Sequence, residues 1–268
     1  MKGLDLSFAQ PSQAWWNKRY TEGWRVLVQD AWTGVVQPTP TLVNLNRART
    51  AGFITAAYVV VNNLPGATSV GWARQACGAE WDYLNFVAVD VEVPTTIKSI
   101  EEALFEVTRL GKKRCIYTSK NAWKVVNSTT RFSQEWLWNA YYDGDPDFDF
   151  FLNPYGGFAK LAGEQYQGTT NLDGYSVDLN NFSAAFIEQE SDDMSLTAEQ
   201  LANLISSEEF GYYIRTRPVL RERFGRAVAD ALAAAVDGHR LADPHGGGGV
   251  TIEQVRDEID SATIHAAD

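Results

Sequence analysis

The chain has 268 residues, 34 of them acidic and 23 basic, which gives a formal net charge of −11. Apolar residues make up 45% and charged residues 21%, as is typical of a globular protein with one large domain or a medium domain plus an appendage. No apolar run approaches the roughly 20 residues of a membrane-spanning helix, so we exclude a membrane span. Because the chain is acidic and no basic cluster is longer than Lys112–Arg114, we also predict no nucleic-acid partner.

The residue types that most often hold metal ions are scarce. The three histidines, His239, His245 and His265, all lie late in the chain in polar surroundings. The two cysteines, Cys77 and Cys115, are predicted to be buried free thiols. We therefore predict no metal site and no other cofactor.

The composition changes sharply near residue 190, which predicts two regions. Residues 1–190 hold all nine tryptophans and carry 16 basic against 20 acidic side chains. Residues 191–268 have no Trp and no Lys, and their 7 arginines face 14 acidic residues. We therefore predict a domain over 1–190 and an acidic tail over 191–268.

Eight apolar or β-branched runs in the first region predict β-strands. They are Gly3–Phe8, Trp24–Gln29, Phe53–Val61, Phe86–Glu92, Arg114–Thr118, Glu135–Tyr141, Glu164–Gln167 and Tyr175–Leu179. Helices are predicted between several of them, at Thr41–Ala51, Val70–Trp81, Ile97–Leu110 and Ser119–Val126.

The alternation of strands and helices predicts an α/β fold with a mostly parallel sheet. Eight strands in about 190 residues predict an irregular (β/α) TIM-like barrel in which several helices are shortened or missing. The last three strands have little helix between them, so we expect that side of the barrel to be irregular.

The tail predicts a C-terminal helical extension. Thr197–Gln200 has the pattern of a capping box, and Pro218–Val236 places its apolar residues on one helical face. Gly246–Gly249 is predicted to be a flexible linker ahead of a short amphipathic segment, 251–259. Because none of these helices could bury its apolar stripe alone, the alternatives are an intramolecular cap, a homo-oligomer, or attachment to a larger assembly.

Four carboxylates lie near the C-terminal ends of three predicted strands: Asp5, Asp90, Glu92 and Asp178. Strand interiors normally exclude carboxylates, because burying an unpaired charge is costly. In a β/α barrel the C-terminal ends of the strands form the mouth where active sites lie. We therefore expect the four acids to meet at one cleft. The alternative is that they cap helices or pair with arginines at the rim.

Asp90 and Glu92 are two residues apart, which on a strand puts both on one face with Cβ atoms about 6–7 Å apart. A like-charged neighbour at that distance raises the pKa of one member, so that it keeps its proton near neutral pH. A protonated carboxyl beside charged ones is the arrangement that cleaves glycosidic bonds.

Aromatic residues on the predicted strands agree with a sugar ligand. Tyr58, Tyr117, Trp138, Tyr141 and Tyr166 all lie on these strands. Aromatic faces around a carboxylate cluster suit sugar rings, while for any single aromatic residue core packing is the alternative role.

Six short segments together carry a resemblance to a known family. They are Gly3–Ser7, Asp90–Glu92, Ile116–Ser119, Leu137–Tyr141, Gln165–Gln167 and Val177–Phe182. On these segments, which occur in the family's order, the chain resembles glycoside hydrolase family 25, the lysozymes (N-acetylmuramidases) that cut bacterial peptidoglycan and are common among phage endolysins. The resemblance covers residues 3–182 and implies the same irregular barrel.

The resemblance also implies roles for individual residues. Glu92 would be the general acid that protonates the leaving oxygen. Asp90 and Asp178 would stabilise the developing positive charge or orient the substrate's 2-acetamido group, and Asp5 would hold substrate or a neighbouring acid. The sugar cleft would be lined by Tyr58, Tyr117, Trp138 and Gln165, with Tyr141 and Tyr166 beside them.

Two segments depart from the family's pattern. After the second strand the family usually has Lys/Arg-Ala-Thr/Ser-Glu-Gly, whereas this chain has Asp30-Ala31-Trp32-Thr33-Gly34 and lacks both the base and the glutamate. Glu164 stands where a tryptophan often precedes Gln165. These changes affect the substrate subsites, and all four acids persist.

The leading prediction is a muramidase that hydrolyses the β-1,4 bond between N-acetylmuramic acid and N-acetylglucosamine in bacterial cell-wall peptidoglycan. Its tail would serve attachment, oligomerisation or wall targeting. Because the segment Met1–Asp5 has no apolar signal core, we expect release by the host lysis machinery or carriage in a phage particle. The alternatives are a barrel that binds wall glycan without cutting it, as a virion structural or adhesion component, and an unrelated barrel hydrolase for other glycans.

Overall fold

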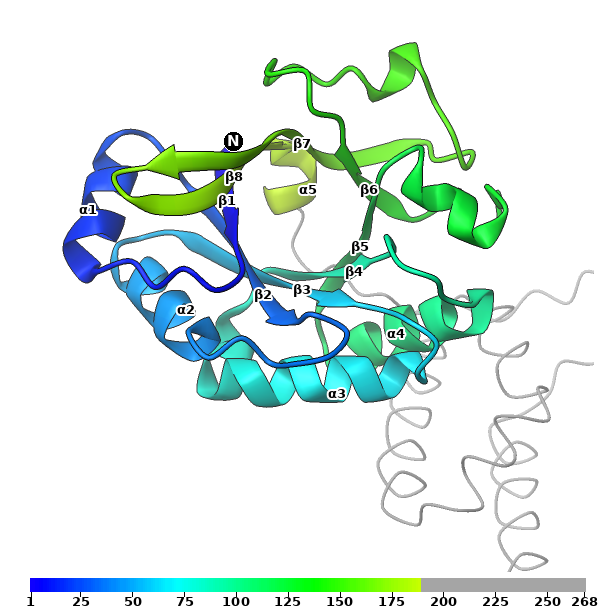
Figure 1. The fold of residues 1–268 in the computed structure, drawn as a ribbon, viewed down its shortest axis with the longest axis horizontal. Helices are drawn as coiled ribbons and strands as arrows, with labels where there is room; N and C mark the ends of the chain where they lie inside the picture. Colours follow the sequence, from blue (N-terminus) through cyan, green and yellow to red (C-terminus); the bar gives the residue numbers. More distant parts are fainter. Residues whose placement is uncertain (189–268) are drawn as a thin grey trace, which may run out of the picture. The chain divides into compact units, whose positions relative to one another are not determined.

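A computed structural model describes residues 1–188, which form a closed barrel of eight strands with helices outside it (Figure 1). The strands are β1 (Lys2–Leu6), β2 (Val26–Trp32), β3 (Ile54–Val60), β4 (Phe86–Asp90), β5 (Lys113–Thr118), β6 (Trp136–Ala140), β7 (Lys160–Leu172) and β8 (Tyr175–Phe182). Each strand pairs with its neighbours in sequence, and β8 pairs with β1 to close the barrel. The predicted α/β barrel is confirmed.

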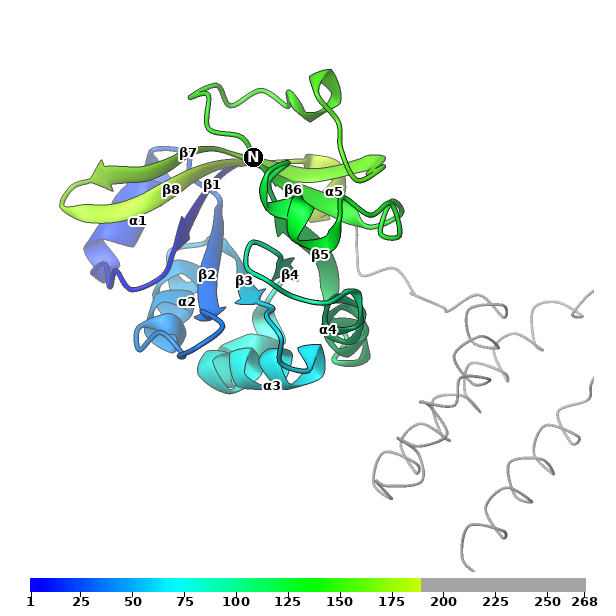
Figure 2. The same cartoon turned by 45° about the vertical axis from the view of Figure 1, so that its right-hand side comes forward.

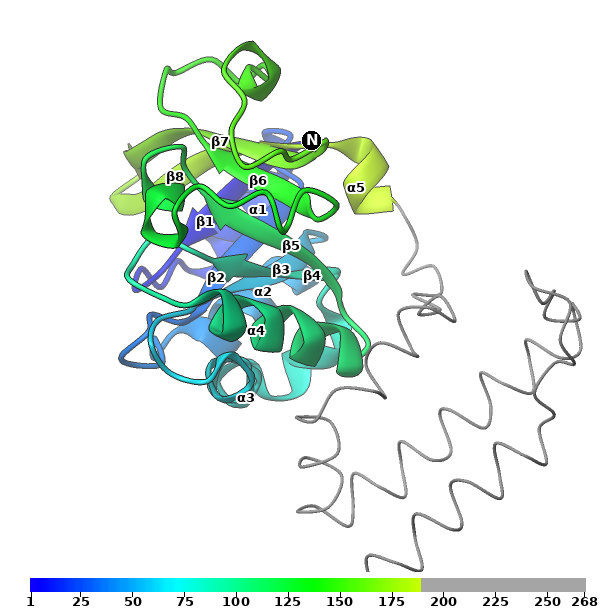
Figure 3. The same cartoon turned by 90° about the vertical axis from the view of Figure 1, so that its right-hand side faces the viewer.

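The described residues form five helices around the barrel. They are α1 (Gln13–Thr21), α2 (Thr41–Thr50), α3 (Gly66–Cys77), α4 (Ile97–Arg109) and α5 (Ala184–Glu188), with 3₁₀ segments at Gly78–Tyr83, Ala122–Val126 and Phe150–Leu152. Figures 2 and 3 show α2, α3 and α4 along β2 to β5, while the opposite side carries the β7–β8 ribbon and the long loop between β6 and β7.

The predicted helices differ in how well they match. Those at 41–51 and 97–110 are confirmed within one residue at each end, whereas α3 begins four residues before the predicted Val70 and ends at Cys77. The predicted helix at 119–126 is only a short 3₁₀ segment. The short helices α1 and α5 were not predicted.

Antiparallel pairing makes one side of the barrel irregular, as expected. Strands β1 to β7 run parallel, and β8 runs antiparallel to both β7 and β1. The turn between β7 and β8 is Asp173-Gly174, with φ values of 51° and 89°, which suits a tight hairpin between twisted strands. Because β7 continues into this hairpin, it is much longer than the predicted 164–167. Its second half was not predicted because it contains polar residues such as Thr169 and Thr170.

The predicted strand 86–92 ends two residues early, and this is a correction. The pairing of β4 with its neighbouring strands stops at Asp90, and Glu92 follows in irregular chain. Pro94 lies just beyond and cannot donate a hydrogen bond to a neighbouring strand. Asp90 and Glu92 are therefore not two positions of one strand face.

Two apolar layers lie on the two sides of the strands. Outward-facing residues such as Leu27 and Val87 pack with Ile100 of α4 in the larger cluster. Inward-facing residues, including Val28 and Ala88, form a second cluster inside the barrel. Because successive strand residues alternate between the two layers, the inner cluster fixes which residues face the mouth.

The predicted tail helices and the Gly246–Gly249 linker lie outside the described residues. Both cysteines are buried free thiols, as predicted. Within residues 1–188, no helix has the length and apolar character to cross a membrane.

Gly66 begins α3 where this helix meets α4, and it provides a test of the fold. A Cβ at Gly66 would lie 1.8 Å from the Ser99 carbonyl oxygen and 2.6 Å from the Ala103 nitrogen. Because both are backbone atoms of α4, Gly66→Ala should lower the free energy of unfolding by about 2 kcal/mol or more. Thermal unfolding followed by tryptophan fluorescence measures the change.

Gly71 in the same helix provides the matched control. A Cβ there meets nothing within 4 Å, so Gly71→Ala should raise the free energy of unfolding by about 0.5–1 kcal/mol through helix propensity. Equal shifts in the two variants would contradict the close packing of α3 on α4.

Candidate active site

The inner apolar layer gives way to polar side chains at the mouth. Inward-facing Val28 is followed two residues later by Asp30, and Ala88 by Asp90. The same step along the other strands brings further polar residues to this level. We call this set the mouth ring: Asp5 of β1, Asp30 of β2, Tyr58 of β3, Asp90 of β4, Tyr117 of β5, Gln165 of β7, and Asp178 and Asn180 of β8.

Gln165 joins the two halves of the mouth ring. Its Nε2 donates hydrogen bonds to Asp5 (2.7 Å) and to Asp178 (3.3 Å). Its Oε1 accepts hydrogen bonds from the hydroxyls of Tyr117 (2.8 Å) and Tyr142 (2.7 Å). The amide is therefore fixed in one orientation, and it holds two carboxyl groups on a single nitrogen.

Asp5 is a buried carboxyl with two amide donors. Besides Gln165, Asn180 Nδ2 donates to it at 2.7 Å, and the Asn180 Oδ1 accepts from the Trp138 indole at 2.9 Å. Burial and the charge of Asp178 raise the pKa of Asp5 to about 7, and the two amide hydrogen bonds only partly oppose this. A large fraction of Asp5 is therefore protonated near neutral pH.

Asp90 and Glu92 lie in different environments. Asp90 is only 5% exposed, and one of its oxygens has no hydrogen-bond partner. Burial and then the charge of Glu92 raise the pKa of Asp90 well above its usual range. Glu92 is exposed to solvent, and partial desolvation followed by the charge of Asp178 raises its pKa.

Asp178 completes the predicted set of four acids. It is half-buried on β8 and also accepts a hydrogen bond from the Thr169 backbone N–H at 2.5 Å. Burial raises its pKa, and the Thr169 hydrogen bond opposes that rise. The structure thus brings Asp5, Asp90, Glu92 and Asp178 to one mouth.

The predicted aromatic residues occupy three kinds of position. Tyr58 and Tyr117 belong to the mouth ring. Trp138 is 1% exposed and packs beneath Tyr117, with ring centroids 4.5 Å apart, so it supports the cleft rather than lining its open surface. Tyr141 is 48% exposed, and Tyr166 is half-buried beside a shallow second hollow.

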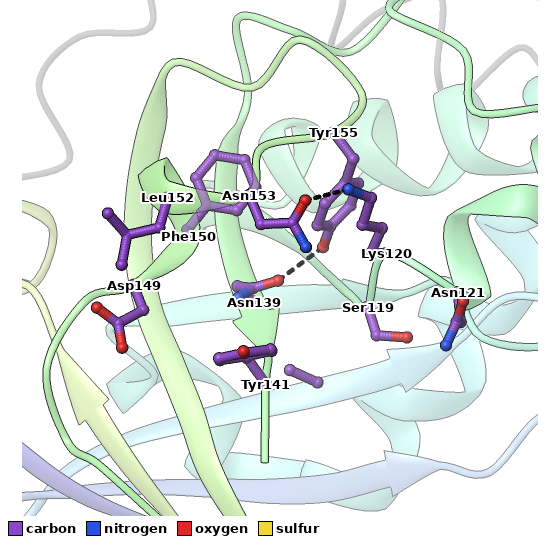
Figure 4. Close-up of a pocket in the computed structure, with 11 residues that line it drawn as sticks. Ser119, Lys120, Asn121, Asn139, Tyr141, Asp149, Phe150, Leu152, Asn153 and Tyr155 are labelled. Atoms are coloured by element: carbon purple, nitrogen blue, oxygen red, sulfur yellow. Dashed lines mark hydrogen bonds between the residues drawn. The ribbon is translucent and has the colours of Figure 1, made fainter. Parts of the chain in front are cut away.

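A pocket of about 340 Å³ opens between the segment after β5 and the loop after β6, as Figure 4 shows. On its walls Lys120 donates to Asn153, and the Tyr155 hydroxyl donates to Asn139 Oδ1 at 2.9 Å. Asn139 in turn donates to Glu164 at 3.3 Å. Glu164 is fully buried, which raises its pKa to about 7.

Sequence reasoning missed several polar residues at the mouth. Asp30 is only 3% exposed. It follows the inward-facing apolar residues of β2, just as Asp90 follows those of β4. This position in the sequence could have predicted that Asp30 lies at the mouth. Asn180 lies two residues from Asp178 and therefore on the same strand face. Ser7, whose hydroxyl lies 2.7 Å from the Tyr58 hydroxyl, and Tyr142 carry no such signal, because they follow strands in irregular chain.

Across residues 1–188, no group of three or more His, Cys, Asp or Glu side chains is arranged to hold a metal ion. Together with Glu92, the mouth ring resembles the acid pairs of enzymes that cleave sugars, because an exposed acid of raised pKa lies beside buried carboxyls at the mouth of a β/α barrel.

Comparison with known proteins agrees with this class. No protein-family model matches the chain. The probable GH family 25 lysozyme 3 of Dictyostelium discoideum is 39% identical over 84 residues, which are 31% of this chain but only 18% of that relative. The probable GH family 25 lysozyme 2 of the same organism is 33% identical over 148 residues, 50% of this chain and 68% of that relative. The chain belongs to glycoside hydrolase family 25.

A solved structure extends the agreement to the barrel itself. The muramidase from Acremonium alcalophilum superposes with a TM-score of 0.57 at 19% identity, over 70% of this chain and 98% of the other. At that level of identity the likeness concerns the fold.

The raised pKa values predict how stability depends on pH. The pKa of Asp5 rises from 3.8 to about 7 in the folded protein, so between these values the folded state binds more protons than the unfolded chain. This contribution to stability is complete at low pH and is lost as the pH rises through about 7.

The variant Asp5→Asn isolates this effect. Relative to the variant, the wild type should lose about 2–4 kcal/mol of unfolding free energy as the pH rises from about 4 to about 7.5. Urea unfolding followed by tryptophan fluorescence reports on the barrel, because all nine tryptophans lie within residues 1–190. Parallel curves for the two proteins would show that Asp5 ionises normally.

Proposed function

We propose that the protein is a lysozyme that hydrolyses the β-1,4 bond between N-acetylmuramic acid and N-acetylglucosamine in bacterial peptidoglycan. The observation that carries this proposal is a contrast among the acids at the mouth. Glu92 is open to solvent and has a raised pKa, while Asp90, on which the charge of Glu92 acts, and Asp5 of β1 are buried. Membership in a family of lysozymes supports the choice of substrate.

In this proposal Glu92 is the general acid. As the bond between the anomeric carbon and the leaving oxygen breaks, the carboxyl proton of Glu92 moves to that oxygen. Water adds to the anomeric carbon, and the proton that it loses restores Glu92. An acid of ordinary pKa would be almost fully ionised near neutral pH, so the raised pKa of Glu92 keeps more of the active form.

The remaining carboxyls would act on the charge that develops in the sugar ring. Ionised Asp90 and Asp178 would stabilise the positive charge at the anomeric carbon or orient the 2-acetamido group. Asp5 would act through Gln165, which it shares with Asp178. Tyr58 and Tyr117, which belong to the mouth ring, would contact the sugar rings of the substrate.

The proposed partner is therefore the bacterial cell wall. Phage origin, release by lysis or carriage in a particle, and a homo-oligomer or phage-particle partner for residues 191–268 stay predictions of the sequence. The alternative function, glycan binding without cleavage, differs from the proposal only in whether the bond is broken.

Replacing the proposed general acid tests the mechanism. Glu92→Gln should lower the rate at which reducing ends appear in a peptidoglycan suspension by about 10²–10⁴-fold, because the amide cannot donate a carboxyl proton. Glu101→Gln on α4 makes the same chemical change outside the barrel and should leave the rate unchanged.

Each outcome decides between the alternatives. Equal rates in wild type and Glu92→Gln would remove Glu92 from the mechanism. Wild-type protein that sediments with peptidoglycan but releases no reducing ends would support the non-cleaving glycan-binding barrel.

A further inference from the structure

The pocket between the segment after β5 and the loop after β6 lies beside the mouth ring. Ser119 follows β5 two residues after Tyr117 of the ring, and Asn139 lies near the C-terminal end of β6. The Tyr141 backbone N–H donates to the Gln165 carbonyl oxygen at 3.0 Å, which joins the pocket wall to β7. The pocket and the mouth ring are therefore neighbours at the C-terminal ends of the strands.

Tyr155 connects the pocket with the proposed general acid. Its hydroxyl lies 2.9 Å from Asn139 Oδ1 and 3.1 Å from the Thr118 carbonyl oxygen. Burial, then the charges of Glu164 and Glu92, raise the pKa of Tyr155. A substrate held beside Glu92 would therefore reach the wall of this pocket.

Two further asparagine oxygens on the pocket wall are already occupied. Asn153 Oδ1 accepts a hydrogen bond from the Lys120 ammonium. Asn121 Oδ1 accepts one from the Lys124 ammonium at 2.9 Å. These bonds set the orientation of each amide and leave its nitrogen for other partners.

The groups that stay available on this wall are hydrogen-bond donors. Within residues 1–188, neither Asn121 Nδ2 nor Asn153 Nδ2 donates to another group of the chain. The Ser119 hydroxyl accepts from the Ala122 backbone N–H at 3.1 Å, so its own hydrogen can be donated to a ligand. Lys120 is exposed, and its ammonium has three donor hydrogens, of which Asn153 accepts one. The wall thus presents a positive charge surrounded by neutral donors.

The negative charge of the pocket lies apart from these donors. Figure 4 shows Ser119, Lys120 and Asn121 on one side of the pocket and Asp149 on the other. An anion at the donor side would therefore be kept away from the Asp149 carboxylate. Because hydrogen bonds to a charged acceptor are about twice as strong as those between neutral groups, this wall favours a carboxylate over a neutral oxygen.

We propose that this pocket binds a carboxylate of the peptide stems that peptidoglycan carries on its muramic acid residues, with Lys120 as the counter-ion. The proposal rests on the proposed lysozyme function, which supplies the substrate. Where the lactyl groups of the glycan carry peptides, the glycan itself is uncharged, so the carboxylates near the scissile bond belong to the peptides.

The apolar part of the pocket suits a peptide as well. Phe150 and Leu152 line it, and Leu152 is 81% exposed. An apolar side chain that is open to solvent beside a cation can cover the short side chains of a peptide, and this contact stabilises the complex by burying apolar surface.

NMR titration of the full-length protein tests binding without any need for catalysis. The probes are a synthetic stem tetrapeptide with free carboxyls and the same peptide with its carboxyls converted to carboxamides. The free-carboxyl peptide should shift the side-chain amide signals of Asn121 and Asn153, and the carboxamide peptide should bind about tenfold more weakly. Equal affinity for the two peptides, or a tighter carboxamide, would overturn the proposal.

Lys120→Met removes the proposed counter-ion and keeps most of the length of the side chain. The difference in affinity between the two peptides should fall to about twofold or less in this variant. Lys98→Met makes the same change on α4, outside the barrel, and should keep the tenfold difference. A difference that persists in Lys120→Met would show that Lys120 does not hold the carboxylate.

Release of reducing ends separates this proposal from the function on which it rests. Wild-type protein should cleave a glycan with free-carboxyl stems at a kcat/KM about tenfold above that for the same glycan with carboxamide stems. Equal cleavage of both would overturn the role of the pocket and leave the lysozyme function in place. Peptide binding that depends on Lys120, with no cleavage of either glycan, would overturn the lysozyme function alone.

Discussion

The hydrogen bonds of the Gln165 amide hold the mouth ring together. One nitrogen serves Asp5 and Asp178, and one oxygen serves Tyr117 and Tyr142. Rotating the amide by half a turn would set its oxygen against two carboxyls and its nitrogen against two hydroxyls. The orientation is therefore fixed by four partners from β1, β5, β8 and the loop after β6, and those elements are fixed in return.

The reversal of β8 brings two of these partners, Asp5 and Asp178, together beside Gln165. Because β8 runs antiparallel to β1, Asp178 lies directly opposite Asp5, and on the other side Asn180 lies opposite Gln165. Two carboxylates in directly opposed positions repel each other, and here both are also at least partly buried. The repulsion is relieved when a carboxyl keeps its proton. The geometry that gathers the acids therefore also raises their pKa values.

The sequence predicted the barrel because its signals are local. Apolar runs such as Phe86–Val89 and the helical spacing of 97–110 report on burial of each segment by itself. It also predicted that the four acids gather, because the end of a strand locates a residue at the mouth. The prediction placed Glu92 on a strand face, but the chain leaves β4 at Asp90.

What the sequence did not predict depends on contacts between distant segments. Asp30 was read only as a departure from a family pattern, and its burial follows from closure of the whole barrel. The roles of Gln165 and Asn180 as shared donors depend on the register between β7, β8 and β1, which no local pattern encodes. Trp138 supports the ring from below because of its inward strand position.

The most direct test of the account is a crystal structure of the Glu92→Gln variant with a muramyl–glucosaminyl oligosaccharide. The account predicts a sugar ring across the mouth ring, with the bridging oxygen of the glycosidic bond within hydrogen-bond reach of residue 92 and the anomeric carbon facing Asp90 and Asp178. An oligosaccharide bound only in the pocket between Lys120 and Asn153, or elsewhere on the surface with the acids turned away from it, would contradict the account.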